Sequence, residues 1–136
     1  MRFADTNVLL YSVSTLPAES VKAATAQSLL AGRDLAVSVQ VLQEFYVQAT
    51  RPSRRDPLTH DEALGFIRAW RRFHTQDITL AVLDDALDIK IRYQLSYWDS
   101  AIIAAARACG CDEVLSEDMS DGQDYVGVRV INPFKP

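Results

Sequence analysis

The sequence contains few residues of the kinds that define several classes of protein. Cys109 and Cys111 are the only two cysteines among 136 residues, so a disulfide framework is excluded and a reducing cytoplasm is the expected compartment. A membrane helix requires about 20 consecutive apolar residues, and no apolar run in the sequence is that long. An acid as early as Asp5 argues against a secretory signal. We therefore expect one domain over residues 1–136 and no membrane segment.

Basic residues are also in the minority. The net charge is −4, from 14 basic and 18 acidic residues, which excludes a general nucleic-acid coat. The charge is unevenly distributed, because residues 51–72 contain six arginines and residues 112–124 contain acids and no base. The first segment is a candidate for binding phosphates and the second for binding cations, unless both are solvated surfaces.

Several catalytic signatures are missing. The chain has no G-x-S-x-G, G-x-x-x-x-G-K-[ST] or G-x-G-x-x-G motif. His60 and His74 are the only histidines, which gives little basis for a nucleophile–base pair, and Cys-Gly-Cys is the only paired spacing that a zinc site could use. Nucleophilic catalysis, nucleotide binding by a glycine-rich loop and zinc chemistry are therefore poorly supported.

What is present is an alternation of short apolar segments with helical periodicity. The apolar runs predict strands at 2–5, 35–37, 77–78, 113–116 and 128–131. Capping residues and apolar stripes predict helices at 7–12, 18–31, 39–50, 59–73, 79–93 and 101–109. This alternation predicts an α/β fold with a mostly parallel sheet that is covered on both faces. Ligands of such sheets bind outside the carboxyl ends of the strands.

Four acids do not fit a purely structural pattern. Asp5 and Asp118 follow predicted strands, Asp99 lies among apolar residues in a first helical turn, and Glu44 lies within a largely apolar helix. Each has a structural explanation taken singly: a helix cap for Asp5, a turn for Asp118, a capping box with Ser96 for Asp99, and a solvent-facing position for Glu44. Tyr97 and Trp98 beside Asp99 are interpreted as packing residues rather than as a platform for a nucleobase.

Taken together, the four acids favour a metal site. Carboxylates gathered without a cation repel one another and raise one another's pKa. Carboxylate oxygens and water are the ligands that suit Mg²⁺, with Mn²⁺ as a possible substitute. The arginine and proline loop after the Glu44 helix adds Arg51, Arg54 and Arg55 as candidate ligands for an RNA backbone, with a solvated loop as the alternative.

Four segments resemble the motifs of PIN-domain nucleases in the same order along essentially the whole chain. They are Asp5-Thr6-Asn7-Val8-Leu9-Leu10-Tyr11, Val41-Leu42-Gln43-Glu44-Phe45, Leu95-Ser96-Tyr97-Trp98-Asp99-Ser100-Ala101 and Leu115-Ser116-Glu117-Asp118-Met119. The sequence is most similar to the VapC-type toxins of bacterial toxin–antitoxin modules. The resemblance implies a three-layer α/β/α fold and a Mg²⁺-dependent ribonuclease that cleaves tRNA or rRNA.

The resemblance also implies roles for individual residues and partners. Asp5, Glu44, Asp99 and Asp118 would form the acidic pocket, with Asp5 and Asp99 as the most direct Mg²⁺ ligands. Thr6 and Ser116 occupy hydroxyl positions that support such a pocket, and Asp121 would assist or replace Asp118. The implied partners are an RNA substrate, a second copy of the chain in a homodimer, and a VapB-type antitoxin whose tail enters the site.

Three alternatives remain at this point. A phosphotransfer domain also places an acid at a strand end, but Asn7 stands where haloacid-dehalogenase phosphatases need a second acid. A PIN-like interaction module that has lost catalysis predicts broken acids, and all four are present. A PIN-domain nuclease of RNA maturation, without an antitoxin, fits the sequence as well as a toxin does.

Overall fold

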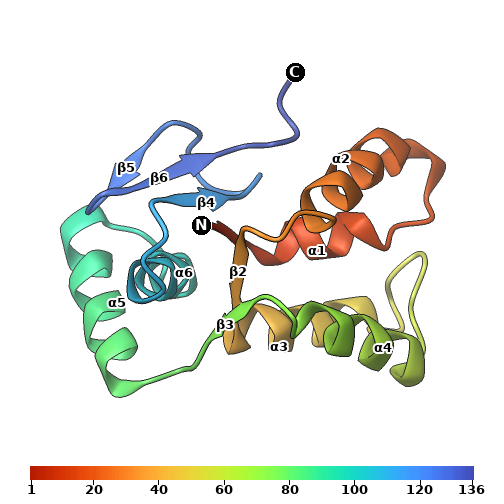
Figure 1. Ribbon diagram of the computed structural model, residues 1–136, viewed down its shortest axis with the longest axis horizontal. Helices are drawn as coiled ribbons and strands as arrows, with labels where there is room; N and C mark the ends of the chain where they lie inside the picture. The colour runs from red at the N-terminus through yellow and green to blue at the C-terminus, as the bar shows by residue number, and fades with distance from the viewer.

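The centre of the computed structural model, which describes residues 1–136, is a six-stranded sheet (Figure 1). The strands are β1 (Arg2–Ala4), β2 (Leu35–Ser38), β3 (His74–Gln76), β4 (Glu113–Leu115), β5 (Asp124–Tyr125) and β6 (Val128–Ile131). Their order is β3-β2-β1-β4-β6-β5, and every pair is parallel except β5 with β6. The predicted α/β class with a mostly parallel sheet is confirmed.

Helices cover both faces of this sheet. They are α1 (Thr6–Ser12), α2 (Ser20–Leu30), α3 (Val39–Ala49), α4 (His60–Trp70), α5 (Leu80–Tyr93) and α6 (Tyr97–Ala108), with a 3₁₀ turn at Pro17–Glu19. Helix α6 packs against β2, β3, β4 and β6, and α5 packs on the outside of α6. Helices α1 to α4 lie on the other side of the strands, where α1 contacts both α2 and α3 (Figure 1). The three layers agree with the α/β/α arrangement that the resemblance implied.

Short polar caps between strands and helices place the helix N-termini at the carboxyl edge of the sheet. Asp5 follows β1 directly and caps α1, and Ser38 ends β2 and caps α3 by accepting the N–H of Val41. Helix α6 is capped by Ser96, and Asp99 in its first turn lines the same cavity as Asp5, so this N-terminus lies at the same edge. The fully buried side chains of Phe3, Val114 and Phe45 anchor these segments in one core.

Two strand predictions are wrong. The edge strand β3 is His74–Gln76 and pairs with β2 through Ala36 and His74, whereas the sequence predicted a strand at 77–78. An edge strand is half solvated, so it needs no apolar run and gives no hydropathy signal. The two-residue strand β5 lies in a segment predicted as an acidic turn, where a hairpin at Val126 and Gly127 returns the chain to β6.

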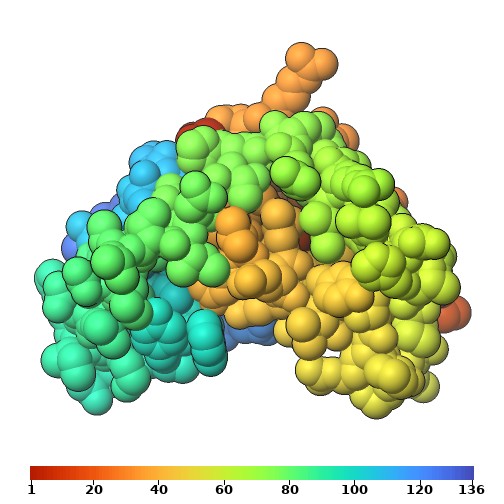
Figure 2. Space-filling view, turned by 90° about the horizontal axis from the view of Figure 1, so that it is seen from below, coloured from red at the N-terminus to blue at the C-terminus, as the bar shows by residue number.

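The apolar stripe of α5 points away from the core. Val82, Ala86 and Ile89 are the residues that α5 buries. The exposed residues instead recur on the other side of the helix, namely Leu80, Leu83, Leu87 and Ile91. Figure 2 shows α5, in green to blue-green, as a ridge at one edge of the molecule. A cavity of about 270 Å³ lies between it and residues of α3 and α6. None of the helices has the length and apolar character needed to cross a membrane.

Candidate active site

The four acids singled out in the sequence line one cavity of about 330 Å³. Asp5 reaches it from the end of β1, Glu44 from the middle of α3, Asp99 from the first turn of α6, and Asp118 from the loop after β4. Segments that lie up to 113 residues apart in the chain therefore meet at the carboxyl edge of the sheet. The structure brings together every acid that the sequence placed in the pocket.

Asp5 is the buried member of the group. Its Oδ1 accepts the backbone N–H of Thr6 at 2.7 Å, and its Oδ2 accepts the hydroxyl of Ser116 at 2.8 Å. Burial raises the pKa of Asp5 from 3.8 to about 7, because the hydrogen bonds from Ser116 and Thr6 only partly offset the loss of solvation and the charges of Asp118 and Glu44 raise it further. The carboxyl group is held in place, yet it is costly to ionise without a cation.

Glu44 points into the cavity rather than to solvent. Its Oε2 accepts the hydroxyl of Thr6 at 2.7 Å, and its Oε1 accepts the side-chain amide of Gln40 at 2.9 Å. Gln40 precedes Glu44 by one helical turn, so both lie on the same face of α3. Thr6 thus connects Asp5 through its amide and Glu44 through its hydroxyl, in agreement with the supporting position predicted for it.

Asp99 does not form the capping box expected from the sequence. The hydroxyl of Ser96 accepts the backbone N–H of Asp99 at 3.1 Å, but the Asp99 carboxylate makes no return bond and no other hydrogen bond within the chain. Its pKa is raised, first by burial and then by the charges of Asp118 and Glu44, against the effect of Ser96. The carboxylate is therefore free to bind a ligand in the cavity.

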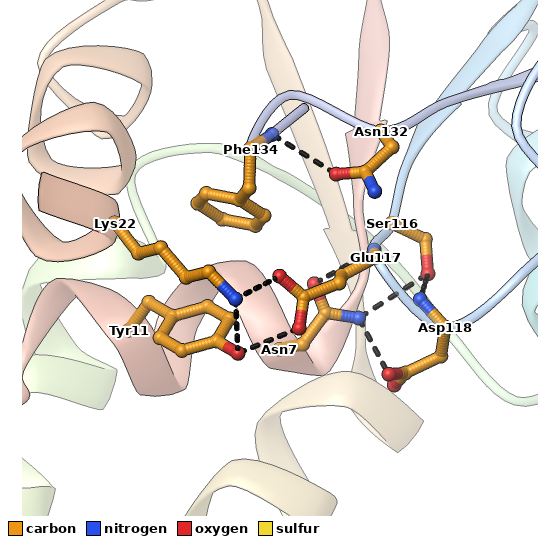
Figure 3. A network of polar contacts seen from close by, with 8 residues as sticks. All are labelled: Asn7, Tyr11, Lys22, Ser116, Glu117, Asp118, Asn132 and Phe134. Carbon is orange, nitrogen blue, oxygen red and sulfur yellow. Dashed lines mark hydrogen bonds and ion pairs between the residues drawn. The ribbon is translucent and has the colours of Figure 1, made fainter. Parts of the chain in front are cut away.

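Asn7 contacts both strand-end acids, Asp5 and Asp118, and the sequence predicted no role for it. Figure 3 shows its contacts with Asp118, Ser116 and Glu117. Its side-chain amide donates to Asp118 Oδ2 at 3.1 Å, to Ser116 Oγ at 3.2 Å and, more weakly, to Asp5 Oδ2 at 3.5 Å. Its carbonyl oxygen accepts the N–H of Glu117 at 3.2 Å. Asn7 therefore fixes the loop after β4 relative to α1. Its place two residues after Asp5, on the first turn of a helix, was the only available signal.

A second set of contacts holds the same loop through Glu117, the residue before Asp118 (Figure 3). Glu117 accepts the hydroxyl of Tyr11 at 2.6 Å and pairs with the ammonium of Lys22 at 2.7 Å. Although partial burial opposes it, these two partners lower the pKa of Glu117. Phe134 packs edge-on against Tyr11, with ring centroids 4.8 Å apart. Helices α1 and α2 and the C-terminal segment thus restrict the loop that bears Asp118.

Asp121 lies apart from the pocket. Its carboxylate accepts the backbone N–H of Asn132 at 2.8 Å and pairs with Lys135 at 3.2 Å, and it does not line the cavity. Those two partners lower its pKa. Asp118 rather than Asp121 is therefore the acid that this structure places beside Asp5.

The three arginines that were candidates for RNA binding differ in their positions relative to the cavity. Arg54 lines the acidic cavity, whereas Arg51 and Arg55 are exposed and do not. The interpretation of Trp98 as a packing residue is wrong, because its side chain is 64% exposed and lines the cavity. It lies on the first turn of α6 beyond the edge of the sheet, where no element covers it.

The donor set fits a hydrated Mg²⁺. None of the ion pairs in the chain involves Asp5, Glu44, Asp99 or Asp118, so the protein itself provides these carboxylates with no counter-ion. No three His, Cys, Asp or Glu side chains lie close enough together to hold a metal ion by themselves. Mg²⁺ binds through one or two carboxylates and keeps several of its waters, so spaced carboxylates around a polar cavity suit it. The acids, rather than the two cysteines, are the residues able to hold a metal.

The fold and the site together define an α/β domain with an acidic pocket at the carboxyl edge of its sheet. A family model of the PIN domain matches residues 2–120. The chain therefore belongs to the PIN domain family. No curated protein matches it significantly.

Several solved structures share this fold. A toxin–antitoxin complex from Klebsiella pneumoniae aligns over 98% of both chains at 19% identity, with a TM-score of 0.70. VapC20 from Mycobacterium tuberculosis, a toxin that cleaves the sarcin–ricin loop, aligns over 87% of this chain and 92% of its own at 20% identity, with a TM-score of 0.67. FitAcB from Neisseria gonorrhoeae aligns over 98% and 99% at 19% identity, with a TM-score of 0.63.

The raised pKa of Asp5 predicts how Asp5→Asn alters stability in EDTA. The carboxyl group binds its proton more tightly in the folded state, so the stability that it contributes is complete below pH 4 and is lost as the pH rises through about 7. Asn does not titrate, so the stability of Asp5→Asn does not fall in this way. Its free energy of unfolding relative to the native chain should therefore rise by about 1–3 kcal/mol between pH 5 and pH 8. Urea unfolding at both pH values measures this difference.

Asp121→Asn is the matched control. The pKa of Asp121 is lowered, so this group is ionised in both the folded and the unfolded chain throughout the interval. The stability difference for Asp121→Asn should be the same at pH 5 and pH 8. A flat difference for Asp5→Asn as well would contradict the electrostatic account of the pocket.

Proposed function

We propose that the chain is a Mg²⁺-dependent endoribonuclease that hydrolyses phosphodiester bonds of tRNA or rRNA as the toxin of a toxin–antitoxin pair. The observation that carries this proposal is the meeting of four carboxylates from four separate elements in one cavity without any protein counter-ion. Membership of the PIN domain family supports a nuclease. The cytoplasm, where such RNA is found, is the compartment in which we propose that it acts.

The residues of the cavity have different roles in the proposed reaction. Asp5 and Asp99 would hold the metal, Asp5 as the anchored ligand and Asp99 as the carboxylate without a competing hydrogen bond. A bound Mg²⁺ supplies Lewis-acid chemistry, because it acidifies water and offsets charge on a phosphate, and Mn²⁺ is a possible substitute. Thr6 and Gln40 hold Glu44 where it is able to orient the attacking water and accept its proton. Asp118, held by Asn7, would complete the ring or bind a second ion.

Removing either proposed metal ligand should abolish cleavage without unfolding the chain. We expect Asp5→Asn and Asp99→Asn to lower the rate of RNA cleavage by at least about a hundredfold, since each removes a charge that the reaction needs. The assay uses purified tRNA and rRNA with Mg²⁺, Mn²⁺ or EDTA, and thermal unfolding with and without Mg²⁺ provides a reading independent of activity. The native chain should gain stability with Mg²⁺ and both variants should gain less.

Asp124→Asn is the control, because that acid lies on β5 and does not line the cavity. Its cleavage rate and its response to Mg²⁺ should equal those of the native chain. Cleavage by Asp5→Asn at the native rate would remove Asp5 from the site. Full native activity in EDTA would show that the reaction needs no metal ion.

The antitoxin part of the proposal depends on charge. The cavity has four carboxylates that form no ion pair within the chain, and Arg54 is the one basic residue of its lining, so it is complementary to a cationic peptide segment. The fold is shared with a toxin–antitoxin complex from Klebsiella pneumoniae, which supports an inhibitor of the same kind here. A PIN nuclease of RNA maturation would use the same cavity and would need no such inhibitor.

Co-expression distinguishes a toxin from a nuclease of RNA maturation. If the chain is a toxin, its expression alone should arrest growth, and the product of the neighbouring gene should copurify with it and restore growth. A synthetic peptide of that product's most basic segment should inhibit cleavage, and replacing its Lys and Arg residues with Gln should weaken inhibition at least about tenfold. Active enzyme without toxicity and without a copurifying product would favour RNA maturation.

The exposed stripe of α5 supports the proposed homodimer. Leu80, Leu83, Leu87 and Ile91 recur at helical spacing on a face that nothing in the chain covers. Contiguous apolar residues of this kind mark association surfaces. A second copy of the chain would bury them by pairing α5 with α5 about a twofold axis.

Leu87→Asp should weaken the dimer at least about tenfold, because it places a charge in the middle of the stripe. Light scattering over a dilution series measures the change. Val21→Asp is the matched control, since Val21 is 78% exposed on α2 and lies off the stripe. Equal weakening by both variants, or by neither, would contradict this interface.

A further inference from the structure

Arg54 differs from the other arginines of its segment in being part of the cavity wall. It lines the same cavity as the four carboxylates, and its side chain is only 19% exposed. Arg51 and Arg55, three residues before it and one after it, are exposed. Arg54 is therefore the one arginine of the loop that lines the cavity of the four acids, whereas Arg51 lines a neighbouring hollow that shares Glu44 and Trp98 with it.

Arg54 forms an ion pair with Asp56, which in turn contacts a distant segment of the chain. Its Nε lies 3.1 Å from Oδ1 of Asp56, whose side chain is 10% exposed. The other oxygen of Asp56 accepts the backbone N–H of Thr15 at 2.9 Å and the hydroxyl of Thr15 at 3.3 Å. Figure 1 shows the loop between α3 and α4, in yellow, reaching toward the segment between α1 and α2. Asp56 thus attaches the loop to the rest of the molecule and orients Arg54.

Asp56 remains ionised while it does this. Burial acts to raise its pKa, but the Thr15 N–H and the charge of Arg54 outweigh burial and lower it. The ion pair uses the Nε side of the guanidinium. No hydrogen bond in the chain uses the two terminal nitrogens of Arg54, and its one ion pair is with Asp56 rather than with an acid of the cavity. The anchored side is therefore occupied and the outer edge of the guanidinium fork is available.

We infer that Arg54 is the residue that binds a backbone phosphate of the RNA substrate next to the cleaved bond, and that Asp56 is a positioning residue for it. This inference rests on the proposed function. An RNA strand that enters the cavity meets the four acids together with Glu19, which also lines it. Its flanking phosphates are repelled by any of these carboxylates that a metal does not offset. A guanidinium held at the wall counters this repulsion, and its two terminal N–H groups match the geometry of phosphate oxygens. Arg51 and Arg55 have no such anchor and contribute little.

The test measures RNA binding without cleavage. Every variant is made in the Asp5→Asn background, and the probe is a fluorescein-labelled single-stranded RNA of mixed sequence, followed by anisotropy from 50 to 300 mM salt. We expect Arg54→Gln to weaken binding about tenfold and to lower the slope of log affinity against log salt by about 0.7, the value for one phosphate contact on a single strand. Arg54→Lys should recover the salt slope but not the full affinity, because an ammonium does not bind phosphate as a fork.

Arg68→Gln is the matched control, because it removes the same charge from an exposed position on α4 away from the cavity. It should alter affinity less than twofold. Asp56→Asn should weaken binding about threefold while leaving the salt slope unchanged, since it retains the charge of Arg54. The double variant Asp56→Asn with Arg54→Gln should bind the RNA as weakly as Arg54→Gln alone. If the role of Asp56 were purely structural, Asp56→Asn would weaken binding further in the double variant.

The possible failures are distinguishable. If the native chain cleaves RNA and Arg54→Gln binds the probe as its parent does, this inference fails and the proposed function stands. Equal losses in Arg54→Gln and Arg55→Gln would indicate a diffuse basic loop and would also overturn it. If the native chain does not cleave RNA with Mg²⁺ or Mn²⁺, the proposed function fails, whatever Arg54 contributes to binding.

Discussion

The structure depends on holding ionisable carboxyl groups together at the edge of a sheet, partly out of water. An ionised carboxylate loses solvation when it is buried, and nearby like charges add to that cost. The protein offsets the cost with neutral donors alone: the amide of Thr6 and the hydroxyl of Ser116 on Asp5, and the hydroxyl of Thr6 on Glu44. Neutral donors fix the position of a carboxylate but leave its charge in place. The pocket is therefore rigid and short of positive charge, which is the condition that a divalent ion relieves.

Much of this arrangement could be predicted from the sequence, because the topology of a parallel sheet determines which chain positions meet. Asp5 follows β1 directly, and Asp118 follows β4, which is the neighbour of β1. The carboxyl ends of parallel neighbours lie at one edge, so recognising the two strands was enough to place the two acids together. The caps at Ser38 and Ser96 identify where α3 and α6 begin, and these helices bring Glu44 and Asp99 to the same edge.

The features that escaped prediction are decided by tertiary contacts rather than by local pattern. A short edge strand such as β3 needs no apolar residues, since half of it faces water. The apolar stripe of α5 has the periodicity of a core-facing stripe, but α6 packs against Val82, Ala86 and Ile89 instead. For Asp99 the spacing to Ser96 predicted a reciprocal cap, and the carboxylate turns to the cavity. The role of Asn7 depends on Ser116 and Asp118, more than 100 residues away, and no local signal reports such a contact.

The distribution of cations around the pocket follows the same logic. Lys22 and Arg54 are held near the cavity, and each is paired with an acid that lies outside the group of four: Lys22 with Glu117, and Arg54 with Asp56. If either cation paired with Asp5, Glu44, Asp99 or Asp118, it would lower the pKa of that acid and compete with a metal for its oxygens. Glu117 and Asp56 therefore have two effects. They hold a positive charge close enough to meet an incoming polyanion, and they keep that charge away from the carboxylates that the metal would need.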